Sequence, residues 1–124
     1  MFSRRFVVKV IRVLMLWILP VLTGLLFLAA GASKFAGPAW PANFARWGFP
    51  NGFYLVTGIL EIAGGLALIV PRFRMVAGAV LAAVMVGAVV TTLAHGEPRF
   101  ARTASIYLVA LVVIVAGHWR LRAS

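Results

Sequence analysis

The hydrophobic positions of this chain fall into four long runs, separated by short groups of basic and turn-forming residues. The runs cover residues 13–33, 47–71, 75–96 and 103–119. A helix needs about 20 apolar residues to cross a bilayer, with a range of about 17–25. Because the backbone must satisfy its own hydrogen bonds in hydrocarbon, the runs predict helices. Their expected bounds are 12–35, 52–70, 74–95 and 102–119.

These runs predict an all-α fold, a transmembrane four-helix bundle that forms one domain over residues 1–124. Pro41 and Gly48 bracket a further short helix, Pro41–Trp47, in the loop after the first run. The aromatic side chains around it favour the membrane interface. They are Trp40, Phe44, Trp47 and Phe49. Pro20 lies inside the first predicted helix and is expected to kink it.

The distribution of basic residues predicts the orientation in the membrane. Eight Lys and Arg residues lie on the side that holds both ends of the chain and the turn at 71–74, and four lie on the other side. The side richer in Lys and Arg is normally cytoplasmic. We therefore expect an inner-membrane protein whose N and C termini both face the cytoplasm.

The first run also has features of a cleaved signal peptide. It follows a basic start and ends in Ala30–Ser33, whose small residues resemble a cleavage site. However, its apolar run is longer than the usual ~7–15 residues of a signal peptide. This length favours a retained helix, with cleavage as the alternative.

Composition excludes several classes of function. Hydrophobic residues make up 64% of the chain and charged residues 11%, which is far from the composition of a soluble domain. The net charge of +10 comes in groups between apolar runs, a pattern typical of membrane orientation and not of binding to nucleic acid. The absence of Cys excludes thiol chemistry, and no nucleophile–base pair, phosphate loop or metal-ligand spacing is present.

Glu61 is the most informative residue because an acidic side chain in the middle of a membrane helix is costly and usually functional. Its helical neighbours form a stripe of small and polar residues that must face the bundle interior. They are Tyr54, Thr57, Gly58, Gly64 and Gly65. Two interpretations remain open: a functional acid, or a structural acid that only locks the bundle.

Polar residues gather in the outer half of the predicted bundle, whereas the inner halves are almost entirely apolar. This distribution predicts a pocket that opens to the outer side, has Glu61 at its floor and is sealed below. The candidate ligand-binding residues are Lys34, Tyr54, Thr57, Glu61, Thr91, His95 and Tyr107. Each Ser, Thr or Tyr alone is more often an interhelical hydrogen bond than a ligand contact.

Lys34 and Glu61 are expected to interact, because helical side chains lean toward the N-terminus and these two lean toward each other. Helix rise gives a depth difference of ~15 Å, so we expect a water or a hydroxyl to bridge them. Tyr54, Thr57 and His95 are the candidate bridges, and Arg46 is the competing partner of Glu61.

The two histidines are predicted at opposite membrane faces, so they cannot share a metal or haem. His118 is expected at the inner interface. The third helix is rich in small residues, which lets membrane helices approach closely. Packing within the bundle is the simpler interpretation, and contact with a second copy in a homo-oligomer is the alternative.

Five short motifs together resemble the DoxX-like family. They are GASKF at Gly31–Phe35, WGFP at Trp47–Pro50, GILE at Gly58–Glu61, GGLAL at Gly64–Leu68 and MVGA at Met85–Ala88. The resemblance covers about residues 12–118. It implies a bacterial four-helix membrane protein, with Lys34 and Glu61 at the family's recurring charged positions.

The resemblance also implies a function, since the family's namesakes are subunits associated with thiosulfate:quinone oxidoreductase. A small accessory membrane subunit is therefore the first hypothesis, with quinone or another lipidic molecule as the ligand and a redox or stress-response protein as the partner. No cofactor other than quinone is suggested, and a sulfur relay within this chain is disfavoured without Cys. The alternatives are a structural or assembly protein, and a small transporter or proton pathway that uses Glu61.

Overall fold

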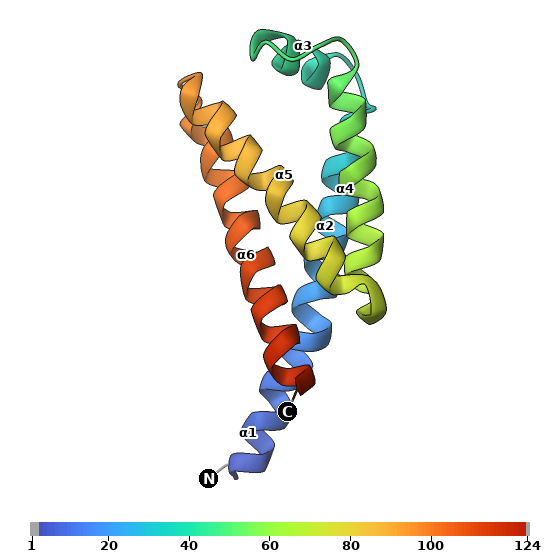
Figure 1. Cartoon of the computed structure of the whole chain (residues 1–124), viewed down its shortest axis with the longest axis vertical. Coiled ribbons are helices and arrows are strands. Elements are labelled where there is room, and N and C mark those ends of the chain that lie inside the picture. Colours follow the sequence, from blue (N-terminus) through green and yellow to red (C-terminus); the bar gives the residue numbers. More distant parts are fainter. Residues whose placement is uncertain (1–2, 124) are drawn as a thin grey trace.

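The computed structural model describes residues 3–123 and consists of helices joined by short connections (Figure 1). The first membrane helix is continuous from Arg4 to Ser33 and includes a π-helical turn at Leu14–Ile18. The helices are α1 (Arg4–Val13), α2 (Leu19–Ser33), α3 (Ala39–Arg46), α4 (Phe53–Ile69), α5 (Arg74–Ala94) and α6 (Pro98–Ala123). The predicted all-α membrane bundle is thus confirmed.

The predicted helix bounds were too short at two places. The first helix begins at Arg4, where the Ser3 hydroxyl caps it by accepting the Phe6 N–H at 3.1 Å. The last helix begins at Pro98, a residue favoured in the first turn because it lacks an N–H. The short loop helix begins at Ala39 instead of Pro41, and Gly48 follows it with a left-handed φ of 84°.

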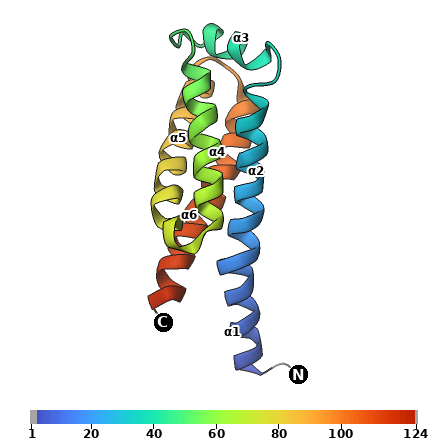
Figure 2. The same ribbon diagram turned by 90° about the vertical axis from the view of Figure 1, so that its right-hand side faces the viewer.

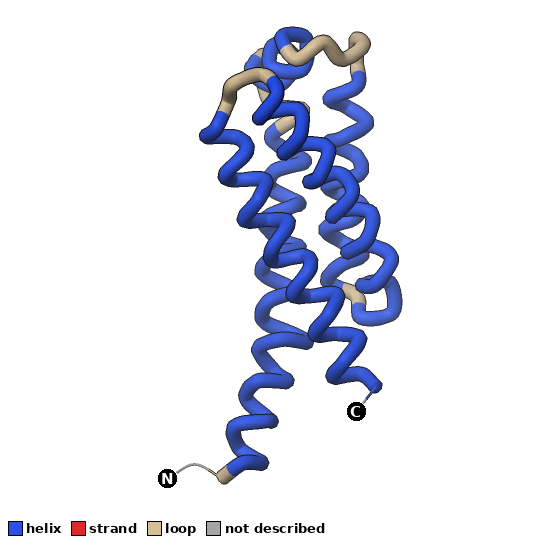
Figure 3. The backbone as a smooth tube through the Cα atoms, turned by 60° about the vertical axis from the view of Figure 1, so that its left-hand side comes forward, coloured by secondary structure: helices blue, strands red, loops and turns tan. Residues whose placement is uncertain are grey.

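The helices are arranged as two pairs. α2 packs along α4, and α5 packs along α6 (Figure 2). The start of α1 and the end of α6 lie together at one end of the bundle, and α3 lies at the opposite end (Figure 1). We call the latter the α3 end. The connections between helices lie at the α3 end, except for the turn between α4 and α5, which lies toward the opposite end (Figure 3).

Glycines bring α2 and α4 into close contact. A Cβ atom on Gly24 would lie 2.7 Å from the Gly65 carbonyl oxygen, and one on Gly31 would lie 2.7 Å from the Gly58 carbonyl oxygen. Both contacts exclude any larger residue. In membrane helices, small residues at the interface allow this kind of backbone approach. The two glycine pairs therefore fix how far α2 is shifted along α4.

The core lies in the half of the bundle that is away from the α3 end. Five of its side chains, from all four membrane helices, have no exposed surface: Phe27, Leu68, Leu81, Leu111 and Ile114. Large apolar side chains that face outward are strongly exposed, for example Val76 at 70% and Ile106 at 62%. Because so much exposed apolar surface is unfavourable in water, these outward faces are suited to contact with lipid.

Three helical segments are long and apolar enough to span a membrane: Arg4–Ser33, Pro71–Ala94 and Pro98–Leu121. α4 is apolar as well but has 17 residues, the lower limit of the usual range. Glu61 is the ninth residue of α4 and lies at its middle. The chain is therefore a membrane protein built on a helical bundle.

Arg74 was assigned by sequence to a cytoplasmic turn, but the structure buries it almost completely, with 1% of its surface exposed. Its guanidinium donates to the carbonyl oxygens of Leu68, Ile69 and Leu16, at 2.8, 3.1 and 2.7 Å. The first two carbonyls end α4 and lack a helical partner. The third lies one turn before Pro20, which has no N–H to offer it.

Pro20 was expected to kink the first helix, and the irregularity found there is the π-helical turn at Leu14–Ile18. Single π-turns are among the recognised irregularities at which a helix bends. Arg74 thus joins the irregular part of the first helix to the end of α4, from the first turn of α5.

Candidate functional site

A cavity of about 540 Å³ lies at the α3 end, between the helices and beneath α3. Its volume falls within the ~300–1,000 Å³ typical of ligand pockets. Aromatic residues form much of its wall: Trp40, Phe44, Trp47, Phe49, Phe53, Phe100 and Tyr107. Small residues of α5 line another side, including Ala83, Gly87 and Ala88. A largely apolar wall of this kind suits a lipidic molecule.

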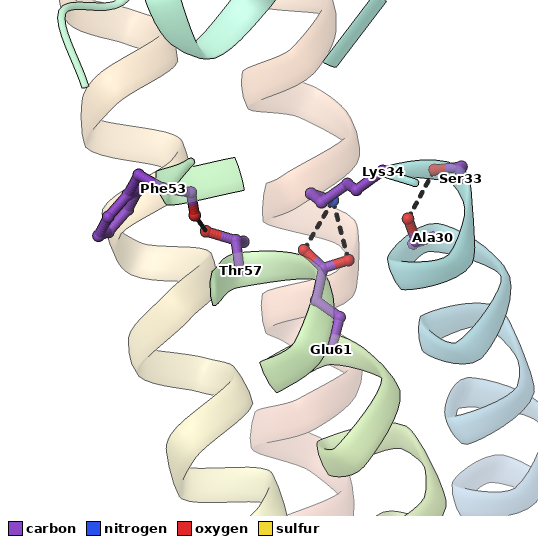
Figure 4. A network of polar contacts seen from close by, with 6 residues as sticks. All are labelled: Ala30, Ser33, Lys34, Phe53, Thr57 and Glu61. Atoms are coloured by element: carbon purple, nitrogen blue, oxygen red, sulfur yellow. Dashed lines mark hydrogen bonds and ion pairs between the residues drawn. The ribbon is translucent and has the colours of Figure 1, made fainter. Parts of the chain in front are cut away.

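Lys34 and Glu61 form an ion pair on the cavity wall (Figure 4). The Lys34 Nζ lies 2.8 Å from Glu61 Oε1 and 3.0 Å from Oε2. The two side chains are only 6% and 3% exposed. Such a pair satisfies both charges in a setting where either charge alone would be unfavourable. The predicted interaction of these residues is confirmed.

The pair is direct and needs no bridge, which corrects the predicted depth difference of ~15 Å. The Gly31–Gly58 contact aligns the end of α2 with the first half of α4. A Cβ on Gly58 would lie 3.2 Å from the Lys34 Cβ, so Lys34 stands level with Gly58, three residues or roughly 5 Å along the axis from Glu61. Thr57 and Tyr54 are therefore not required as bridges, and neither is His95.

Trp40 of α3 covers the ion pair. The Lys34 Nζ lies 4.3 Å from the centre of the Trp40 ring, within range of a cation–π interaction. The same ring lies edge-on to Trp47 and Phe100, with ring centres 6.4 and 5.6 Å away. Trp40 and Trp47 were expected at the membrane interface alone, and their place on the cavity wall was not predicted.

A second ion pair holds α3 to the start of α6. Arg46 Nη2 donates to Glu97 Oε1 at 2.6 Å, and the Trp47 indole N–H donates to Glu97 Oε2 at 3.2 Å. Arg46, proposed as the competing partner of Glu61, thus pairs with Glu97 instead. We refer to the contacts of Arg46 and Trp47 with Glu97 as the Glu97 latch. The latch fixes α3 over the cavity.

Of the seven candidate ligand-binding residues, the structure brings five to the cavity wall: Lys34, Thr57, Glu61, Thr91 and Tyr107. Tyr54 and His95 do not line it. The Tyr54 ring packs edge-on against Phe44, and His95 is exposed with its Nδ1 2.8 Å from the Thr91 carbonyl oxygen. Thr92, Arg99 and Thr103 also line the cavity, although they were not among the candidate ligand-binding residues.

Several residues of the wall are exposed at the surface between α4 and α5. On α4 these are Phe53, Val56 and Leu60, and on α5 they are Ala83 and Gly87. A Cβ on Gly87 would meet no atom within 4 Å, so this position borders open space. The cavity therefore opens sideways between two membrane helices, toward the region that lipid chains occupy.

The model of the DoxX-like family matches residues 18–115, most of the chain. The chain belongs to the DoxX-like family. No curated protein and no solved structure matches it significantly. The match spans the DoxX-like bundle from Ile18 onward, including Lys34, Glu61 and every cavity residue, and it leaves the basic α1 helix outside.

The two histidines of this DoxX-like protein lie far apart, His118 on α6 near its C-terminal end and His95 directly after α5 at the α3 end. His118, for which we expect a position at the inner interface, is buried within the protein, with 5% of its surface exposed. Among the described residues, no group of three or more His, Asp or Glu side chains is placed to hold a metal ion. The chemistry of the site thus rests on the ion pair and the aromatic wall.

Proposed function

We propose that this DoxX-like protein is a small accessory subunit of the inner membrane that binds a lipidic molecule, such as a quinone, and serves a redox or stress-response partner. The single observation that carries the proposal is the cavity of about 540 Å³, which opens between α4 and α5. A molecule dissolved in the bilayer reaches such an opening without passing through water. The partner is inferred from the family resemblance.

The lining of the cavity supports a ligand of the quinone–hydroquinone class. Aromatic side chains such as Trp40, Phe44 and Phe53 offer flat faces for a ring. The Lys34–Glu61 pair and the hydroxyl groups of Thr91 and Tyr107 offer polar contacts along the wall. When bound, a quinone would supply electron and proton transfer. The chain's own contribution would be to hold the ring, orient it and exclude water.

The proposed orientation places the α3 end on the outer side and the two ends of the chain in the cytoplasm. The excess of Lys and Arg at the ends of the chain supports this orientation. With it, the cavity lies in the outer leaflet. The buried core below the cavity, with Leu81 and Leu111 fully enclosed, argues against a path for ions to the cytoplasm. A transporter is therefore disfavoured.

Mass spectrometry of lipids that co-purify from native membranes tests the proposal. Gly87→Phe places a ring at the mouth of the cavity, where the backbone leaves room for it. The matched control is Val90→Phe, on the same helix at a position that is already 62% exposed. We expect a quinone or another apolar lipid in the wild type and in the control, and its loss in Gly87→Phe.

Identical lipid content in all three proteins would contradict a binding function. It would favour the structural interpretation, in which the Lys34–Glu61 pair only locks the bundle. A normal level of folded protein for Gly87→Phe, checked by its helical circular dichroism, separates a blocked cavity from a damaged fold.

A further inference from the structure

The Lys34 ammonium already has partners for its protons within the protein. An ammonium group carries three protons and has no acceptor. Nζ lies against both carboxylate oxygens of Glu61, at 2.8 and 3.0 Å, and the Trp40 ring covers it at 4.3 Å. Lys34 therefore has no proton left to offer to a molecule in the cavity.

Glu61, in contrast, still has free hydrogen-bonding positions. Its two carboxylate oxygens provide about four acceptor positions. Among the residues that the structure describes, Lys34 is the only hydrogen-bond donor to this carboxylate. The ion pair as a whole is neutral. The hydrogen-bonding positions that it still offers to the cavity are acceptors, the free lone pairs of the Glu61 carboxylate.

Three threonine hydroxyls on the wall share this property. Thr57, Thr92 and Thr103 donate their protons to carbonyl oxygens of their own helices, at 3.3, 2.7 and 3.2 Å. Such back-bonding leaves only the oxygen lone pairs free. The wall around Glu61 therefore favours a ligand that brings its own donors.

The donors that remain on the wall are the neutral hydroxyls of Thr91 and Tyr107 and the charged guanidinium of Arg99. Arg99 lines the cavity from the second position of α6, but it is exposed and lies at the α3 end. An anionic headgroup near Arg99 is therefore the alternative ligand chemistry. The buried part of the cavity, where the ligand loses most of its water, is governed by Glu61.

We infer that the cavity selects a neutral amphiphile with hydroxyl donors on its ring, of the hydroquinone class, over the corresponding quinone. The inference rests on the proposed function and names the form of the ligand. A hydroquinone donates an O–H to the free side of the Glu61 carboxylate. A quinone presents carbonyl oxygens, which are acceptors, and so leaves that carboxylate position unsatisfied in an apolar cavity.

Three probes with one decyl chain test the inference: decylhydroquinone, decylquinone and 1,4-dimethoxy-decylbenzene. Their dissociation constants are measured with the full chain in lipid nanodiscs, without oxygen. A hydrogen bond to a charged acceptor corresponds to a factor of roughly ten or more in affinity. We expect the hydroquinone to bind at least about tenfold more tightly than either other probe. The dimethoxy probe keeps the ring and removes only the donors.

The double variant Lys34→Gln with Glu61→Gln removes the carboxylate without stranding a charge. In it, the preference for the hydroquinone is expected to disappear. Even if this variant does not fold, the comparison of the three probes on the wild type tests the preference for the hydroquinone.

The outcomes separate the inference from the proposed function. Equal affinities of the wild type for hydroquinone and quinone would overturn the inference and leave a lipid-binding cavity in place. Tighter binding of decanoate, lost in Arg99→Gln, would overturn it in favour of an anionic amphiphile. Failure of every probe, together with unchanged lipid content in Gly87→Phe, would overturn both.

Discussion

Gly31 of α2 and Gly58 of α4 meet so closely that a methyl group on Gly31 would lie 2.7 Å from the Gly58 carbonyl oxygen. This contact sets the shift between the two helices and thereby places Lys34 one turn above Glu61. The position of the ion pair thus depends on a contact between two residues without side chains.

Gly31→Leu is expected to destabilise the protein, because the larger side chain must push α2 away from α4. Overpacking of this kind typically costs ~1–3 kcal/mol. The control is Ala29→Leu, on the exposed face of the same helix. Thermal unfolding in detergent, followed by circular dichroism, measures the difference. Equal midpoints for the two variants would show that the helices are not held at this distance.

Glu61→Gln alone is expected to destabilise more than Glu61→Gln combined with Lys34→Gln. Removing one partner of a buried pair strands the other charge and typically costs ~3–5 kcal/mol, whereas the double variant leaves two neutral amides. Unfolding free energies of the wild type, both single variants and the double variant complete the cycle. Additive effects would mean that the two residues do not depend on each other.

Arg74→Met is expected to lower the free energy of unfolding by at least about 1–3 kcal/mol, since it leaves buried carbonyl oxygens of Leu68 and Leu16 without donors. Arg72→Met, at an exposed neighbouring position, should change it by less than about 0.5 kcal/mol. Chemical unfolding in micelles gives both values. Similar losses for the two variants would show that the hydrogen bonds of Arg74 do not stabilise the fold.

Glu97→Gln weakens the Glu97 latch and is expected to loosen α3. The Arg46 side chain is half exposed, so the ion pair contributes little to global stability, about 0.2–1 kcal/mol. Its effect should appear locally, as faster amide hydrogen exchange in Ala39–Arg46. The change should be reproduced in the wild type by high salt, which screens exposed charges. Unchanged exchange in the variant would show that the Glu97 latch does not hold α3 in place.

The orientation can be tested with single cysteines, because the natural chain contains none. Gly96→Cys, between α5 and α6, should react from outside intact cells with a maleimide that cannot cross the membrane. Arg72→Cys, in the turn between α4 and α5, should react only after lysis. The reverse pattern would invert the proposed topology.

Much of the fold was predictable because long apolar runs have few structural solutions in a membrane. The four helices and the Lys34–Glu61 pair follow from run length, side-chain direction and the cost of an isolated charge. Helix ends were less predictable, since Ser3 and Pro98 act through caps and turns that a hydrophobic pattern does not register.

The missed parts of the site depend on tertiary contacts. Trp40 reaches Lys34 only because α3 folds over the bundle, and Glu97 selects Arg46 only because the two loops meet there. Arg74 looked like any other basic residue in a turn. The clue in the sequence was Pro20, whose missing N–H leaves a carbonyl that some distant donor must satisfy.

The Arg74 contact with the Leu16 carbonyl has a consequence for biogenesis. The two residues are 58 positions apart, so at ~5–20 residues per second the ribosome makes Arg74 several seconds after Leu16. During this interval the first helix sits in the bilayer with an unsatisfied carbonyl at its irregular turn. We expect nascent chains that end before Arg74 to be degraded faster than chains that end after α5. Pulse-chase labelling of the two truncations measures the difference, and equal lifetimes would exclude it.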